Sequence, residues 1–183
     1  MITNDFAEFV SSQQALSMDD QEPDWNGIVE AWLGDLDGLY KQVIDFLREY
    51  IDRGEISYQF TNVALTEEHL GTYTARKMEI RIGRNKLYLT PIGTLFIGCK
   101  GRVDLVGSMG RVSFFLVGAG VQGASDLIRV TVTHIDGKQV GVNPETQSTK
   151  TWAWKIASHT VPRKLMQLEK NSFLAALMEV ANG

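Results

Sequence analysis

Residues 78–89 read MEIRIGRNKLYL, and this stretch decides the fold. Apolar residues alternate with polar ones from Met78 to Ile82, and again from Leu87 to Leu89. Alternation with a period of two predicts strands that have one face in the core and one in water. The intervening Gly-Arg-Asn has the composition of a hairpin turn and leaves no room for a crossover helix, which takes about a dozen residues. The stretch therefore predicts two antiparallel strands.

The same alternation recurs on both sides of this hairpin. It is found in residues 56–60, 95–97, 103–105, 128–132 and 152–156, and the nearly continuous apolar run of residues 112–117 predicts a buried strand. The connections at 100–101, 107–110 and 136–137 are short and contain glycine, as hairpin turns do. Residues 66–71 predict a single helical turn between strands, and residues 143–149 a long polar loop. Together these patterns predict an antiparallel meander of about seven to nine strands that curls toward a half-barrel.

A long amphipathic helix is predicted before the strands, over residues 25–53. Apolar residues repeat there at intervals of three and four, and Asp24 and Gly54 are suited to cap its two ends. Gly34 and Gly38 each weaken this helix by about 1 kcal/mol relative to alanine. We therefore expect a kink near Gly34.

A second amphipathic helix is expected at the C-terminal end, with Asn171 or Ser172 as its N-cap and an apolar stripe from Phe173 to Val180. The apolar faces of both helices have to be buried against a sheet face. The sequence therefore predicts an α+β fold, in which a long antiparallel β-meander, a curled sheet or half-barrel, packs with a long N-terminal helix and a C-terminal helix. We expect residues 24–183 to form it as a single domain.

Residues 1–23 stand before this domain. Phe6, Phe9, Val10 and Leu16 fall at helical spacing, and an acidic stretch with one proline follows them. The segment predicts either a loose tail or a short amphipathic helix with an acidic linker.

Charge is divided unevenly along the chain. Residues 1–54 hold 12 acidic and 3 basic side chains, whereas residues 55–183 hold 10 acidic and 15 basic ones. Such an asymmetry indicates either an anionic partner or the docking of one part of the chain on the other.

The basic residues gather over the predicted hairpins of residues 76–111, where Glu79 and Asp104 are the only acidic side chains. They are Arg76, Lys77, Arg81, Arg84, Lys86, Lys100, Arg102 and Arg111. A face of this kind can bind phosphates, with an affinity that falls as salt rises. Two other interpretations stay open: a solvated outer sheet face whose basic residues guard against aggregation, or a face covered by the acidic helix.

Trp152 and Trp154 lie two residues apart on one predicted strand and so share a face. Exposed, they would form a stacking platform for a base, a sugar or a peptide. Buried, they are large core residues, and Ile156 on the same stripe favours this second interpretation.

No motif in the chain names a reaction. Gly118 to Gly123 matches G-x-G-x-x-G, but the next predicted strand begins too soon for the helix that a dinucleotide site requires. Asp136 is better explained as part of a turn than as a nuclease carboxylate. The three histidines are scattered, and Cys99 is expected to be a buried, inert thiol. We therefore predict no catalytic residues, no metal and no cofactor, and we favour a protein that is not an enzyme.

The chain has one cysteine and lacks the basic and apolar regions of a secretory signal, so a cytoplasmic location and no membrane contact are expected. The leading hypothesis is an intracellular binding or accessory protein that acts through protein–protein contacts or self-association. The first alternative is nucleic-acid binding by the basic hairpins of residues 76–111. The second is a small-molecule or enzymatic pocket inside the curled sheet.

Overall fold

The structure is a computed structural model, and it describes residues 24–94, 99–121, 151–157 and 164–182. Its elements, in chain order, are α2 (Trp25–Asp52), β1 (Ile56–Glu67), β2 (Gly71–Ile82), β3 (Asn85–Gly93), β4 (Gly101–Gly107), β5 (Gly110–Gly118), β6 (Trp152–Ala157), β7 (Leu165–Gln167) and α4 (Lys170–Asn182). Neither of these helices is long and apolar enough to cross a membrane.

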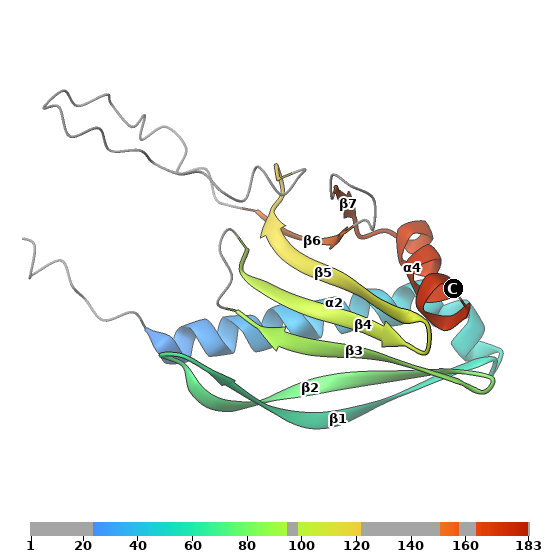
Figure 1. The fold of residues 1–183 in the computed structure, drawn as a ribbon, viewed down its shortest axis with the longest axis horizontal. Helices are drawn as coiled ribbons and strands as arrows, with labels where there is room; N and C mark the ends of the chain where they lie inside the picture. The colour runs from blue at the N-terminus through green and yellow to red at the C-terminus, as the bar shows by residue number, and fades with distance from the viewer. Residues whose placement is uncertain (1–23, 95–98, 122–150, 158–163, 183) are drawn as a thin grey trace, which may run out of the picture.

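The strands form one seven-stranded antiparallel sheet in the order β1-β2-β3-β4-β5-β6-β7. Each strand pairs with its neighbour in the chain, and the two helices pack against the sheet (Figure 1). The predicted α+β fold with a curled antiparallel meander is therefore confirmed. The alternation explains it, because the apolar side chains of each strand point to the face that the helices cover.

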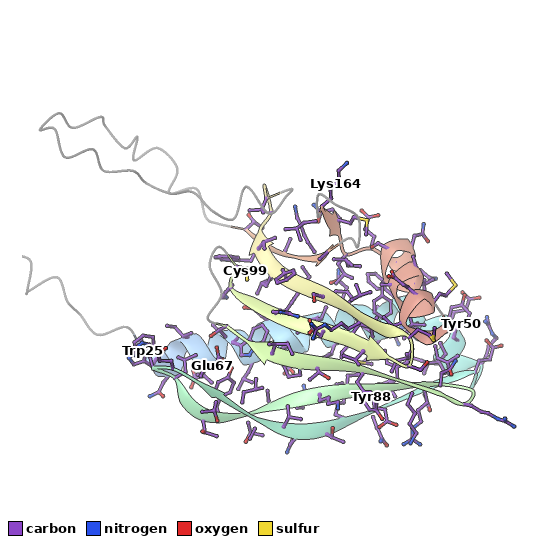
Figure 2. The ribbon with its side chains drawn as sticks, in the orientation of Figure 1. Trp25, Tyr50, Glu67, Tyr88, Cys99 and Lys164 are labelled. Atoms are coloured by element: carbon purple, nitrogen blue, oxygen red, sulfur yellow. The ribbon has the colours of Figure 1, made fainter. Side chains whose placement is uncertain are left out.

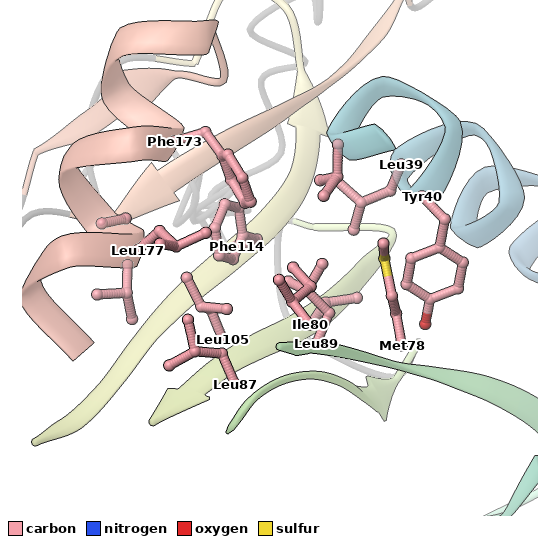
Figure 3. Close-up of a cluster of buried hydrophobic side chains, with 14 of the residues drawn as sticks. Leu39, Tyr40, Met78, Ile80, Leu87, Leu89, Leu105, Phe114, Phe173 and Leu177 are labelled. Atoms are coloured by element: carbon pink, nitrogen blue, oxygen red, sulfur yellow. The ribbon is translucent and has the colours of Figure 1, made fainter. Parts of the chain in front are cut away.

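The core lies between the sheet and the two helices (Figure 3). Met78 pairs with Leu89, and Leu89 pairs with Leu105, so neighbouring strands present their apolar side chains in rows. Phe173 of α4 closes the core over β5, where its ring centre lies 6.3 Å from that of Phe114. All five side chains are fully buried.

The helix α2 runs without interruption from Trp25 to Asp52. The carboxylate of Asp24 accepts a hydrogen bond from the Gly27 amide at 3.0 Å, and Gly54 has a φ of +73° just past the end, so both predicted caps are confirmed. The kink expected at Gly34 is absent from this helix. Packing of its buried stripe outweighs the weak helix propensity of its exposed glycines.

The hairpin of β1 and β2 twists strongly along its length, and its two strands cross in Figure 1. At one end Met78 and Ile80 face the core, whereas at the other Ala75 is buried and Leu65 and Tyr73 pack against the core. Along β2, Met78 and Ile80 are at even positions, whereas Tyr73 and Ala75 are at odd positions. Opposite faces of the hairpin therefore point toward the helices at its two ends.

Three local predictions were wrong. Residues 100–101 do not form a hairpin turn, because β4 begins at Gly101 and the Lys100 amide donates to the Leu116 carbonyl at 2.7 Å. Residues 66–71 do not form a helical turn, because β1 continues to Glu67 and a short turn leads directly into β2, with His69 at a φ of 68°. The helix α4 begins at Lys170, so Ser172 lies in its first turn. The Ser172 hydroxyl accepts from the Glu169 amide at 2.9 Å and donates to the Gln167 carbonyl at 2.7 Å.

The far end of α4 is fixed to the turn between β4 and β5. The Met109 amide donates to the Val180 carbonyl at 3.0 Å, and the Ser108 hydroxyl donates to the Ala181 carbonyl at 3.2 Å. The turn therefore satisfies carbonyls that the last turn of a helix leaves without intrahelical partners.

Several predicted segments lie outside the described residues. They are the segment 1–23, the strands at 95–97 and 128–132, the turn at 136–137 and the loop at 143–149.

Candidate functional site

The basic residues of 76–111 divide between two sides of the sheet. Arg76 forms an ion pair with Asp37 of α2. Lys100 Nζ lies 2.6 Å from Asp35 Oδ2 of the same helix, an ion pair whose geometry is not that of a hydrogen bond. The Tyr40 hydroxyl adds a hydrogen bond of 2.5 Å to the Arg76 carbonyl. The acidic helix thus covers this part of the basic segment, as one of the open interpretations had it.

The other six basic residues lie away from the helix layer. Five alternate with core residues along β2 to β5, and Arg84 lies in the turn between β2 and β3. We call this set the outer basic face; it consists of Lys77, Arg81, Arg84, Lys86, Arg102 and Arg111. The sheet therefore brings together six of the eight basic residues that the sequence singled out.

Two carboxylates lie within the outer basic face. Glu79 accepts hydrogen bonds from Arg81 Nε at 2.5 Å and from Gln59 Nε2 at 3.2 Å, and the Arg81 contact is the main cause that lowers the pKa of Glu79. Asp104 is 3% exposed and accepts two bonds of 2.8 Å from the Arg102 guanidinium. The carboxylates therefore neutralise two of the cations and leave a net positive face.

Aromatic rings are interleaved with these cations. Lys77 Nζ lies 4.2 Å from the ring centre of Tyr88, and the Arg102 guanidinium carbon lies 5.8 Å from that of Phe115. Tyr88 is labelled on β3 in Figure 2. Both distances are within the range of a cation–π contact.

The tryptophans do not join this face. Trp154 pairs with Leu116 and so shares the helix side of the sheet, where its ring centre lies 6.0 Å from that of Trp32. Trp152 is 40% exposed, and Lys100 Nζ lies 5.9 Å from its ring centre. Trp154 is thus a core-side residue, and Trp152 lies near the Lys100–Asp35 ion pair.

The strand β1 is an edge of the described sheet, and sequence reasoning missed it as a surface. It is 12 residues long, and no charged residue and no proline occur from Ile56 to Thr66. Most of its side chains are exposed, with Tyr58 at 38%. The lack of charged residues from Ile56 to Thr66 could be seen in the sequence. The position of β1 at the edge of the sheet is known only from the strand order.

A polar cluster at the tip of the β1–β2 hairpin was also missed. The Glu67 carboxylate accepts from the Thr94 amide at 2.7 Å, from the Thr94 hydroxyl at 3.1 Å and from the Tyr73 hydroxyl. A Cβ at Gly93 would lie 2.8 Å from Glu67 Cδ, so only glycine leaves room for this carboxylate. The pKa of the Tyr73 hydroxyl is raised, mainly by burial and to a smaller extent by its hydrogen bond to Glu67. The cluster holds the hairpin tip to the end of β3.

Two of the hollows in the described part of the molecule lie beside α2. One, of about 370 Å³, lies at the start of α2, and we call it the α2 pocket; it is lined by Asp24, Gly27, Ile28, Ala31, Trp32, Thr94 and Lys100. The other, of about 420 Å³, lies between the end of α2 and α4; it is lined by Leu47, Tyr50, Glu55, Ile56, Ile82, Leu174, Leu177 and Met178. Figure 2 labels Trp25 and Tyr50 near the two ends of the helix.

Within residues 24–94, 99–121, 151–157 and 164–182, no three His, Cys, Asp or Glu side chains lie close enough together to hold a metal ion. Cys99 is half-buried, and burial raises the pKa of its thiol. The surfaces that stand out are therefore the β1 edge and the outer basic face.

Comparison of the chain with family models, curated proteins and solved structures found no match.

Proposed function

We propose that this protein is a binding module that takes up an extended segment of a partner protein by strand addition at β1. The observation that carries the proposal is the long edge of β1, free of charge and proline from Ile56 to Thr66. Natural edge strands are usually short or protected by lysine, proline or a bulge, because their unpaired amides and carbonyls invite another strand. An edge that lacks these devices fits a strand that is meant to pair.

Strand addition has a defined chemistry. Main-chain hydrogen bonds supply affinity, and side chains that alternate along the edge supply specificity. On β1 one side offers the aromatic pair Tyr58 and Phe60, whose ring centres lie 5.8 Å apart. The other side offers Gln59 and Thr61. The fitting ligand is an extended, largely uncharged segment with an apolar residue at every second position.

Selection of a displayed library of random 12-residue peptides against the full chain tests this proposal. We expect peptides that alternate apolar and polar residues and that protect the amides of β1 from hydrogen exchange. The double variant Thr61→Lys/Ala64→Lys should weaken the selected peptides at least tenfold, because lysine on an edge opposes pairing. The variant Gln42→Lys, at an exposed position of α2, is the matched control and should bind as the parent does. Equal binding by the edge variant and the parent would rule out β1 as the site.

A second candidate function is the binding of an anionic polymer, a single-stranded nucleic acid, by the outer basic face. The interleaving of Lys77 with Tyr88 and of Arg102 with Phe115 favours it, since cations that track a backbone and rings that stack on bases are the elements of such surfaces.

Fluorescence anisotropy with a labelled 20-nucleotide single-stranded RNA tests the second candidate. Affinity should fall steeply between about 50 and 200 mM salt, because counterions are released on binding. The triple variant Arg81→Glu/Arg84→Glu/Lys86→Glu should abolish it. Arg48→Glu, on the exposed side of α2, reverses one charge elsewhere and should have little effect. Affinity that ignores salt or survives the triple variant would exclude this face.

A further inference from the structure

The α2 pocket is separate from β1 and from the outer basic face. It lies at the start of α2, between the first turns of this helix and the sheet residues Thr94 and Lys100. Its helix side is formed by Gly27, Ile28 and Ala31. Ile28 is 36% exposed, which is unusual for a large apolar side chain in a hollow. The pocket thus has an apolar wall that the described residues leave uncovered.

The polar side chains around the pocket are already engaged. The Lys100 ammonium lies against Asp35, and the Thr94 hydroxyl donates to Glu67. The Asp24 carboxylate accepts from the Gly27 amide at 3.0 Å. An occupant that suits this pocket therefore has apolar side chains that can cover Ile28 and Ala31.

The chain itself supplies such a segment at the mouth of the pocket. Asp24 is both a lining residue and the first described residue, so residues 1–23 leave from the rim. Within them, Phe6, Phe9, Val10 and Leu16 make one apolar stripe at helical spacing. A helix of this length is marginal in water and needs a surface for its apolar face.

The tether makes the encounter favourable. Residues 17–23 span up to about 23 Å when extended, at roughly 3.3 Å per residue. A segment on a short linker has an effective concentration on the order of millimolar at a site within reach. A weak apolar contact is then sufficient to keep the segment docked.

We infer that residues 3–16 dock in the α2 pocket of their own chain, with the Phe6 and Phe9 side chains against Ile28 and Ala31. The segment covers the apolar wall of the pocket. This docking is independent of any partner at β1, so either proposal can fail without the other.

Cysteine cross-linking in the full chain tests the inference. In a Cys99→Ala background, the pair Phe9→Cys/Ala31→Cys places one thiol on the segment and one on the pocket wall. The control pair Phe9→Cys/Lys41→Cys uses an equally exposed position farther along α2, about 15 Å away at 1.5 Å per residue. We expect the first pair to form an intramolecular disulfide at least tenfold faster than the control, at a rate that does not depend on protein concentration.

A second comparison separates docking from mere proximity of the segment. Phe6→Asp, added to the pocket pair, should slow the cross-link to the rate of the control pair, because it places a charge on the apolar stripe. Ser11→Asp adds the same charge on the opposite side of the stripe and should leave the rate unchanged. Equal rates for the two cysteine pairs would overturn the inference. A cross-link that joins two molecules and speeds up with concentration would also overturn it, because the segment would then dock on a second copy.

Discussion

The Trp32 indole of α2 packs directly against the main chain of β4 at Gly101. A Cβ at this glycine would lie 2.7 Å from Trp32 Cε3 and 2.8 Å from Cη2, closer than real Cβ atoms approach their neighbours. Trp32 is fully buried, and its ring centre lies 6.0 Å from that of Trp154. The long helix is therefore seated on the sheet at a position that admits only glycine.

Gly101→Ala should lower the free energy of unfolding by about 1–3 kcal/mol, the usual cost of overpacking a core. Urea denaturation measures it. Combining it with Trp32→Phe, which removes the part of the ring that clashes, should cost less than the sum of the two single changes. Strict additivity would mean that the ring and the glycine do not compete for the same space.

Gly34→Ala and Gly38→Ala should have the opposite sign. A Cβ at either position meets nothing within 4 Å, and both glycines lie on the exposed side of α2. Each change should raise the free energy of unfolding by about 0.5–1 kcal/mol, because alanine loses less conformational freedom in a helix than glycine does. A loss of stability in the same urea assay would show that these glycines serve another purpose.

The two ion pairs between α2 and the sheet should differ in strength. Asp35 and Lys100 have side chains that are 28% and 33% exposed, whereas Asp37 and Arg76 are 57% and 47% exposed. The more exposed pair should show a coupling energy of about 0.2–1 kcal/mol, and the less exposed pair a larger one, since water screens it less. Double-mutant cycles with Asp→Asn and Lys or Arg→Gln changes, at low and high salt, measure both. A larger coupling for Asp37–Arg76 would contradict this ranking.

Glu79 should contribute to stability only above the pH at which its carboxyl takes up a proton. Its folded pKa lies below the ordinary 4.5, chiefly because Arg81 donates to its carboxylate. A lowered folded pKa stabilises the native state above the unfolded pKa, and this contribution is lost as the pH falls through the folded pKa. The difference in melting temperature between the parent and Glu79→Gln should therefore be constant near pH 7 and shrink below about pH 4.5. A difference in melting temperature that grows in acid would mean that folding raises the pKa of Glu79 instead of lowering it.

The Cys99 thiol should be a slow nucleophile. Burial raises its pKa above the ordinary 9.0, so a smaller fraction is thiolate at neutral pH than in an unfolded chain. Alkylation by iodoacetamide between pH 7 and 10 should show a midpoint above 9.0 for the native protein, and a lower midpoint in urea. A native midpoint below that of the unfolded chain would mark Cys99 as activated.

Local pattern was sufficient to predict most of the fold. The alternation from Met78 to Leu89 predicted two antiparallel strands, because successive side chains of a strand point alternately into the core and into water. The caps of α2 were also local, since Asp24 and Gly54 act within one turn of the helix. The kink at Gly34 was predicted wrongly because propensity acts locally, whereas the packing of the buried stripe does not.

The candidate surfaces depended on relations between distant residues. The division of the basic segment between α2 and the outer face depends on strand parity and on where Asp35 and Asp37 meet the sheet. The bond between Glu67 and Thr94 joins residues whose sequences carry no common motif. A one-residue change in register would send every side chain of a strand to the other face, so these placements could not be derived from composition alone.

Neighbour-to-neighbour strand pairing sets the order in which this sheet is able to assemble. From β1 to β5 no connection is longer than residues 94–100, so the five strands can pair one after another with little loss of chain entropy. The step from β5 to β6 is different, because residues 119–151 separate these two strands in the chain. We therefore expect β6 to pair with β5 more slowly than the earlier strands pair with one another, and Phe173 to join the core after that step.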